Sequence, residues 1–303
     1  MNHAVAASPE VVRTIAELKR KIAEYRGRAG EPGTVGFVPT MGYLHEGHAS
    51  LIRRSAEENG LTVISIFVNP LQFGPNEDFE RYPRDEERDR TVAAEAGANV
   101  IFMPSVEEMY PRPMRTAVSV RGVTERLCGA SRPGHFDGVA AVVAKLLNIV
   151  APDRAYFGLK DAQQVAVVSR MAEDLNLAAE IVPCPIVRAP DGLALSSRNV
   201  YLNEEERRQA LILSQTLKLV PEWAESGATA PELVDRIKRR LGTQPLADID
   251  YVEAVSYPDL EPFSEDLPLN RAEERILVAL AVRFGKTRLI DNVLLERPRK
   301  ERS

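Results

Sequence analysis

The sequence predicts an α/β fold, in which a doubly wound Rossmann-like parallel sheet is followed by a smaller C-terminal α+β domain. Through the first two thirds of the 303 residues, apolar runs of strand length alternate with amphipathic helical runs, the pattern of a parallel sheet covered by helices. After residue 199 the pattern changes to charged helices followed by short strand-like runs. We therefore predict a ligand-binding domain over residues 1–187 and a smaller lid domain over 188–303.

The expected elements follow in chain order. Strand-like runs of the first domain lie at 34–40, 61–68, 99–105, 154–158 and 179–187. The helices between them are expected to begin near Gly47, Arg84, Gly138 and Asp161. In the second domain we expect helices over 204–226 and 231–241 and antiparallel strands over 249–257, 275–284 and 287–296, with a solvated tail at 297–303.

Composition and charge narrow the class of protein. The net charge of -5 and the pI near 5.6 argue against a general nucleic-acid binder, which needs a surplus of Lys and Arg. Cys128 and Cys184 form neither a metal-binding spacing nor a disulfide framework, which favours a reducing cytoplasm. No apolar run has the length of a membrane span, and the N-terminus lacks the apolar core of a signal peptide. We expect small-molecule partners, with no nucleic acid and no membrane.

The most informative stretch is residues 35–55, VGFVPTMGYLHEGHASLIRRS, which runs from a strand into a helix. It carries His45 and His48, half of the four histidines in the chain, beside Gly47. In a doubly wound sheet the loop after such a strand faces the ligand, and the start of the next helix attracts phosphate. Two structural loop histidines or a zinc pair are the alternatives, but there is no HExxH pattern and no third soft ligand nearby. The position at a strand-to-helix crossing favours phosphate.

The H-x-G-H pattern at His45–His48 resembles the HIGH-type nucleotidyltransferase superfamily, and further motifs narrow the choice. They are VPTMGYLHEGH, SIFVNPLQFGPNEDFERYPR (65–84), ASRPGHFDGVAAVVAKL (130–146), FGLKDAQQ (157–164) and DGLALSSRNVYL (191–202). Together, from about residue 12 to about residue 296, they resemble the pantothenate synthetases, the pantoate-β-alanine ligases of coenzyme A biosynthesis. The resemblance implies that the domain over 1–187 binds the nucleotide and pantoate.

This resemblance also implies the site residues. The expected catalytic residues are His48, His45, Lys160 and Arg198, with the histidines stabilising the pentavalent phosphate and the cations stabilising the outgoing pyrophosphate. ATP is expected to contact Pro39, Thr40, Met41, Gly42, Gly47, His48, Gly158, Lys160, Asp161, Val187, Leu195, Ser196, Ser197 and Arg198. Pantoate is expected to contact Gln72, Gln164, Asn69 and Met41. Arg132 and His135 are expected on a loop near the entrance, with His135 in a structural role.

The reaction follows from the same resemblance. ATP-dependent condensation of (R)-pantoate with β-alanine would proceed through a pantoyl adenylate and release AMP and pyrophosphate. Mg²⁺ would bridge the phosphate oxygens and needs few protein ligands, so no protein metal site is predicted. A homodimer is expected from the resemblance alone.

Two other functions remain open at this point. An H-x-G-H nucleotidyltransferase that retains the nucleotide on its product is the first, but it should lack the NPLQF segment around Gln72 and the second glutamine, Gln164. A non-enzymatic nucleotide sensor is the second, but it would be expected to lose the charged site residues. One departure from the family pattern is Leu159, where an acidic or amide residue is common, and it leaves open how Lys160 is oriented.

Overall fold

In the computed structural model, residues 8–27, 33–75 and 77–296 are described, and they form two compact units. The first unit contains the described residues up to Val120 together with Pro133–Leu159 and Val167–Val187. The second contains Arg121–Arg132, Lys160–Ala166 and the described residues from Arg188 onward. The chain thus passes into the second unit at residue 188 and also at residues 121 and 160. The predicted tail 297–303 lies outside the described residues.

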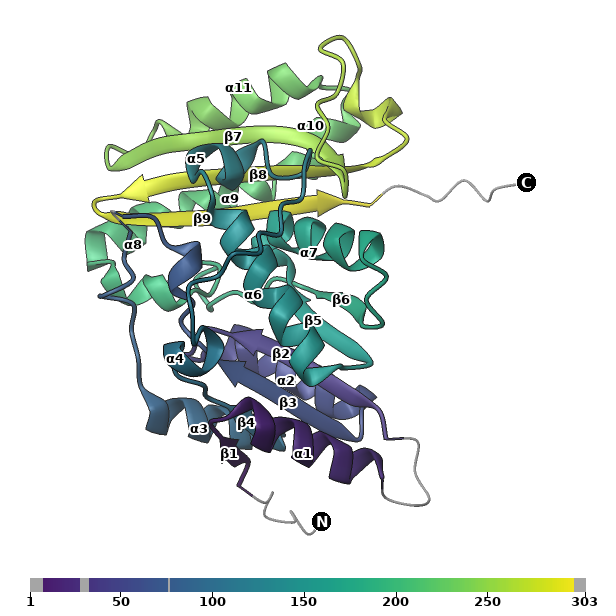
Figure 1. Cartoon of the computed structure of the whole chain (residues 1–303). Helices are drawn as coiled ribbons and strands as arrows, with labels where there is room; N and C mark the ends of the chain where they lie inside the picture. The colour runs from purple at the N-terminus through teal and green to yellow at the C-terminus, as the bar shows by residue number, and fades with distance from the viewer. Residues whose placement is uncertain (1–7, 28–32, 76, 297–303) are drawn as a thin grey trace, which may run out of the picture. The chain divides into compact units, whose positions relative to one another are not determined.

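The first unit contains a six-stranded parallel sheet with the strand order β1-β4-β3-β2-β5-β6 (Figure 1). Its strands are β1 (Glu10–Val12), β2 (Val35–Thr40), β3 (Leu61–Ile66), β4 (Val100–Phe102), β5 (Arg154–Gly158) and β6 (Glu180–Cys184). Five of these were predicted, and the fold class is confirmed. The strand β1 was not predicted, because a run of three residues is too short to show a strand pattern.

Helices connect the strands. They are α1 (Ile15–Arg26), α2 (Glu46–Glu58), α3 (Glu86–Glu95), α4 (Val106–Met109), α5 (Leu127–Ser131), α6 (His135–Val150) and α7 (Ala162–Asp174), with short 3-10 turns η1 (Pro70–Gln72) and η2 (Leu159–Asp161). The observed starts of α2, α3, α6 and α7 lie within three residues of the predicted starts. The helix α1 and the short α4 and α5 were not predicted.

The order of strands reverses at β2. β3 and β4 lie on one side of it, and β5 and β6 lie on the other. β2 pairs with β3 over its whole length, whereas its pairs with β5 are Gly36 with Arg154 and Phe37 with Ala155, both in the first half of β2. The carboxyl half of β2 is therefore not joined to β5 by this ladder. This is the topological switch point, where ligands bind in doubly wound sheets.

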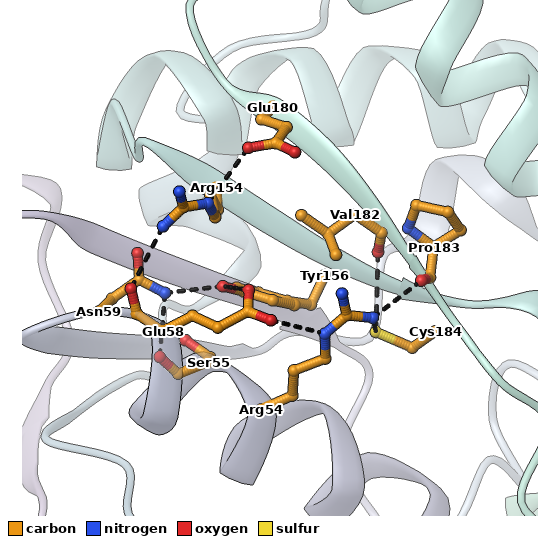
Figure 2. A network of polar contacts seen from close by, with 10 residues as sticks. All are labelled: Arg54, Ser55, Glu58, Asn59, Arg154, Tyr156, Glu180, Val182, Pro183 and Cys184. Atoms are coloured by element: carbon orange, nitrogen blue, oxygen red, sulfur yellow. Dashed lines mark hydrogen bonds and ion pairs between the residues drawn. The ribbon is translucent and has the colours of Figure 1, made fainter.

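A polar network fixes the C-terminal half of α2 to β5 and β6 (Figure 2). Arg54 donates to the side chain of Glu58 at 2.9 Å and to the carbonyl of Pro183 at 3.1 Å. Tyr156 donates its hydroxyl to Glu58 at 2.8 Å and accepts from Asn59 at 2.7 Å. Burial and the nearby Glu58 raise the pKa of Tyr156 to about 12, so its phenol stays a neutral donor. The N-terminus of α2, which carries the histidine motif, is thus the end of a helix anchored to the sheet.

The second unit contains an antiparallel sheet of β7 (Ala247–Tyr257), β8 (Arg275–Phe284) and β9 (Thr287–Leu295), in that order (Figure 1). All three were predicted. The helices are α8 (Glu204–Ala210), α9 (Ile212–Leu217), α10 (Val220–Glu225) and α11 (Ala230–Leu241), with 3-10 turns η3 (Ser197–Tyr201) and η4 (Leu269–Arg271). The helix predicted over 204–226 is instead divided into three, and Pro221 at the start of α10 has no N–H to continue the ladder there.

Each unit has a buried apolar cluster of its own. Leu44, Ile52, Ile64 and Ile101 belong to the first, and all are fully buried. In the second, α11 packs its apolar face on β7, and the buried residues include Leu233 and Ile237. None of the helices among the described residues has both the length and the apolar character needed to cross a bilayer.

Candidate active site

The paired histidines cap the N-terminus of α2. His45 is the N-cap residue, with an extended backbone (φ −137°, ψ 176°), and its Nδ1 accepts from the amide of Gly47 at 3.1 Å. The Nδ1 of His48 accepts from the amide of His45 at 3.3 Å. The two imidazoles therefore play the parts that Ser and Glu play in an ordinary capping box. Their ring centroids lie 4.1 Å apart, with 34° between the ring planes.

These cap bonds set the tautomer of both rings. Because each Nδ1 accepts from an N–H, the proton of each neutral imidazole lies on Nε2. Each ring therefore offers an N–H donor at Nε2, which suits a phosphate oxygen. The backbone amides and the dipole at the start of α2 add positive potential at the same end of the helix. The arrangement favours binding and stabilising an anion.

The loop between β2 and α2 depends on unusual backbone conformations. Gly42 has φ +85° and Tyr43 has φ +50°. A Cβ on Gly42 would lie 2.9 Å from Oδ2 of Asp89 and 2.9 Å from Cγ2 of Ile66, so only glycine fits without a shift. Thr40 closes the turn, since its hydroxyl donates to the carbonyl of Ser65 at 2.7 Å and accepts from the amide of Gly42 at 3.2 Å.

Asp89 holds this loop from α3, and it was not among the predicted site residues. Its side chain is 2% exposed and accepts from the amides of Tyr43 at 2.9 Å and Leu44 at 2.6 Å. Burial raises the pKa of the Asp89 carboxyl, and the two amide bonds oppose that shift. An aspartate in the charged run DEERDR is typical of a solvated helix face. No local pattern signals a bond to a loop 46 residues earlier in the chain.

Three of the predicted pantoate residues meet in the first unit. The side-chain amide of Gln72 donates to Sδ of Met41 at 3.1 Å and accepts from Nδ2 of Asn69 at 3.1 Å. Asn69 is 1% exposed, and its amide also donates to the carbonyl of Gly138 and accepts from the hydroxyl of Tyr110 at 2.8 Å. Burial raises the pKa of Tyr110 to about 12, which keeps this phenol a donor. In this geometry Asn69 orients Gln72.

His135 supports the same segment. It is the first residue of α6, and its Nδ1 lies 2.8 Å from the carbonyl of Gln72. Three residues later, a Cβ on Gly138 would lie 2.1 Å from the carbonyl oxygen of Leu71, so η1 and α6 approach as closely as glycine allows. His135 thus contacts the backbone of Gln72, and its structural role stays a prediction.

Lys160, Asp161 and Gln164 belong to the second unit. Nζ of Lys160 lies 3.9 Å from Oδ2 of Asp161, and the Lys160 side chain is 20% exposed. The adjacent glutamines differ in their surroundings. Gln163 is buried and donates to the carbonyls of Val123 at 2.9 Å and Arg126 at 2.8 Å, whereas Gln164 is only half-buried. Gln163 thus has a structural role, and the binding of pantoate by Gln164 stays a prediction.

The predicted phosphate segment, Leu195–Arg198, also belongs to the second unit. Ser196 caps η3, because its hydroxyl accepts from the amide of Arg198 at 3.3 Å. Ser197 is buried, and Leu195 and Arg198 are half-buried. The turn before this segment is closed by a bond from the amide of Ala189 to the carbonyl of Leu193 at 2.8 Å.

The remaining predicted residues lie at strand ends or helix ends. Gly158 ends β5 and would meet no atom within 4 Å if it carried a Cβ, Val187 follows β6, and Arg132 is the C-cap of α5. Among the residues that the structure describes, no group of three or more His, Cys, Asp or Glu side chains is arranged to hold a metal ion.

Comparison with known proteins identifies the relatives of the chain. The family model described as pantoate-beta-alanine ligase matches residues 10–294. A pantothenate synthetase of Caldicellulosiruptor bescii is 56% identical over 290 residues, which cover 94% of this chain and 99% of the relative. One of Geobacillus thermodenitrificans is 53% identical over 293 residues, covering 96% and 98%.

Solved structures agree with the sequence matches. The pantothenate synthetase of Thermus thermophilus superposes with a TM-score of 0.84 at 48% identity, covering 94% of this chain and 98% of the other. A pantoate-beta-alanine ligase of Francisella tularensis, described as complexed with beta-gamma ATP and beta-alanine, has a TM-score of 0.74 at 33% identity, covering 94% and 97%. The matched span is close to the span of residues 12–296 over which the motifs resemble the same family.

Proposed function

Because the chain belongs to the pantoate-β-alanine ligase family, we propose that it joins (R)-pantoate to β-alanine with ATP and releases AMP and pyrophosphate. The reaction has two steps. The pantoate carboxylate first attacks the α-phosphorus, so an oxygen–phosphorus bond forms to pantoate while the bond to pyrophosphate breaks. The amine of β-alanine then attacks the carbonyl of the pantoyl adenylate, which forms the amide, breaks the bond to AMP and releases a proton.

The first step uses hydrogen-bond donors and cations of the protein. His45 and His48 donate from Nε2 to the α-phosphate oxygens, whose negative charge grows as the fifth bond forms. Lys160, Ser196, Ser197 and Arg198 bind the β- and γ-phosphates and stabilise the charge on the departing pyrophosphate. Mg²⁺ accompanies ATP as part of the substrate, held mainly by phosphate oxygens and water. None of these roles requires a covalent bond to the protein.

The acid is bound by amides in this proposal. Gln72 and Gln164 each offer a donor and an acceptor, which suits a hydroxylated carboxylic acid. The donors and the acceptor of the Asn69 side chain are engaged within the protein. Asn69 therefore holds Gln72 in place and does not itself bind pantoate. Met41 lies against Gln72 and contributes apolar surface. Holding the carboxylate near the α-phosphorus supplies much of the rate acceleration, because the reactants no longer have to meet by diffusion.

The observation that carries this proposal is the pair of imidazoles at the N-terminus of α2. Both rings are held with Nδ1 as an acceptor and Nε2 as a donor, beside the switch point of the sheet. A zinc pair would need an unprotonated nitrogen from each ring and further ligands. A pair of N–H donors at a helix start is suited to phosphate instead.

Pyrophosphate exchange tests the proposal. Given ATP, Mg²⁺, pantoate and labelled pyrophosphate, the protein should return label to ATP without β-alanine, and the exchange should stop when pantoate is omitted. With β-alanine present, free AMP should accumulate. A strict requirement for β-alanine would mean a concerted reaction, and a product that retains the nucleotide would assign the chain to another class of nucleotidyltransferase.

The proposal also covers the oligomeric state of the enzyme, its location and the role of residues 188–303. We expect a homodimer in the cytoplasm, with residues 188–303 acting as a lid that excludes water from the adenylate. Gel filtration with light scattering would measure the oligomeric state.

A further inference from the structure

Two consecutive polar residues are buried in the middle of β9, where the sequence TRLIDNVLL is otherwise largely apolar. Asp291 is 2% exposed and Asn292 is 5% exposed. Adjacent residues of a strand face opposite sides of the sheet, so polar side chains are buried on both sides at this level. Burying a polar side chain costs free energy unless its hydrogen bonds are made, and each such residue calls for a physical reason.

Asn292 contacts the backbone of a predicted catalytic residue. Its Nδ2 donates to the carbonyl oxygen of Lys160 at 3.0 Å, although 132 residues separate the two in the chain. Lys160 lies in η2, a single 3-10 turn of three residues. A bond to its carbonyl sets the orientation of that peptide and therefore the direction in which the Lys160 side chain leaves the backbone.

Asp291 contacts the turn that precedes the predicted phosphate segment, Leu195–Arg198. Both of its carboxylate oxygens accept from the guanidinium of Arg188, at 2.6 and 2.9 Å. Arg188 pairs with Ala194 across the turn that precedes Leu195, and it also donates to the carbonyl of Gly192 at 3.3 Å. Asp291 in addition accepts from the amide of Asn292 at 2.8 Å. One strand thus fixes both Lys160 and the turn that leads into Ser196–Arg198.

We propose that Asn292 is a positioning residue for Lys160, and that the Asp291–Asn292 pair sets the spacing between Lys160 and the Ser196–Arg198 segment. This inference rests on the proposed function, because it assigns both segments to one triphosphate. A cation displaced by about 1 Å loses much of its effect on the transition state, so a residue that fixes the lysine backbone affects the rate without touching ATP.

The test is a double-mutant cycle on pantoate-dependent pyrophosphate exchange. Asn292→Ala should lower the exchange kcat by about 10- to 100-fold, as is typical for partners that orient a functional group. In the Lys160→Ala background, the same substitution should change kcat by less than about twofold, because the group that it positions is already gone. Equal effects of Asn292→Ala in the two backgrounds would overturn the proposal.

Two further variants separate positioning from stability. Asn270→Ala is the matched control, because it also removes a bond from an asparagine amide to a backbone carbonyl in the second unit, that of Glu225, and it should leave kcat unchanged. Asn292→Asp keeps the shape of Asn292 but replaces the donor with a second acceptor facing the Lys160 carbonyl, so its kcat should be at most that of Asn292→Ala. Wild-type exchange by folded Asn292→Asp would contradict the role of the donor. If Asn292→Ala does not fold, Asn292→Asp takes its place in the cycle.

The wild-type protein separates this inference from the proposed function. Absence of pantoate-dependent exchange in the wild type would overturn the proposed function. Normal wild-type exchange together with normal exchange in folded Asn292→Ala would overturn the positioning role alone.

Discussion

Asp89 in the first unit and Asp291 in the second are both 2% exposed, and each holds a loop that carries predicted site residues. Asp89 accepts from two backbone amides, those of Tyr43 and Leu44. Asp291 accepts from the guanidinium of Arg188. The first carboxylate is therefore stabilised by dipoles, and the second is stabilised by a full opposite charge.

The difference predicts how each loop tolerates substitution. A buried carboxylate paired with a guanidinium leaves a strongly unfavourable charge behind when the partner is removed. Asp89 is held by backbone amides instead. Its burial disfavours the charged form and therefore raises the pKa of the Asp89 carboxyl. Removing Arg188, the cation partner of Asp291, should therefore mainly reduce stability, whereas substitutions at Asp89 and in the histidine loop should mainly reduce activity.

The largest effect is expected at His48. His48→Asn keeps an acceptor near the position of Nδ1, so the bond from the amide of His45 can survive, but it removes the Nε2 donor. We expect adenylate formation to fall by about two to four orders of magnitude, as for the loss of a transition-state hydrogen-bond donor. His48→Ala should lose the same activity and, in addition, about 1 kcal/mol of stability from the lost cap.

Pyrophosphate exchange and thermal melting measure the two effects at His48. His48→Gln is the control, because its longer side chain places an N–H near the position of Nε2 and should restore part of the activity. Near wild-type exchange by folded His48→Asn would remove His48 from the catalytic residues.

The next effect is expected at Arg188 and concerns stability. Arg188→Ala leaves the carboxylate of Asp291 buried without its cation and should lower the free energy of unfolding by roughly 3 kcal/mol. Urea denaturation would measure it. Arg207→Ala, which removes a more exposed pair with Asp191, is the control and should cost less than about 1 kcal/mol. Equal losses in the two variants would mean that burial of Asp291 adds nothing.

The sequence predicted the parts of this molecule that are encoded locally. Strand-like runs predicted five strands of the parallel sheet and all three of the antiparallel sheet, and the change from a strand-like to a helical pattern within residues 35–55 located the start of α2. Asp89 and Asn292 were not predicted, because their partners lie 45 or more residues away and an aspartate or asparagine has no local signature of such a bond. The grouping of residues 121–132 and 160–166 with the second unit was missed for the same reason, since only tertiary contacts define it.

A smaller effect is expected at Gln72. Gln72→Ala removes a donor and an acceptor from the proposed pantoate site and should raise the Kd for pantoate by about tenfold, while the Kd for ATP changes little. Calorimetry with each substrate measures the two values. Gln163→Ala, which alters a glutamine buried against Val123 and Arg126, should lower stability instead. A larger loss of ATP affinity than of pantoate affinity in Gln72→Ala would mean that Gln72 belongs to the ATP site and not to the pantoate site.

The smallest change in stability is expected at Asp89. The prediction concerns the direction in which this change varies with pH. Burial, the largest cause, raises the pKa of Asp89 above its ordinary value of 3.8. Between pH 3.8 and the raised pKa, the native state binds more protons than the unfolded state, so the free energy of unfolding falls as the pH rises through that window. The nearby charges of Arg88 and Asp85 are present in wild type and variant alike.

Asp89→Asn removes that titration. The stability of the wild type relative to Asp89→Asn should therefore be greatest at the acid end of the window and decline toward neutral pH, where the two should differ by less than about 1 kcal/mol. Because the asparagine amide offers one acceptor and turns its donor toward the second loop amide, exchange should nevertheless fall about tenfold at neutral pH. Urea denaturation from about pH 4 to pH 7 and exchange at pH 7 measure the two effects, with Glu87→Gln as an exposed control on the same helix. A stability difference that does not vary with pH would mean that burial of the Asp89 carboxylate is not unfavourable. Full activity of Asp89→Asn would mean that this carboxylate is not needed to hold the histidine loop.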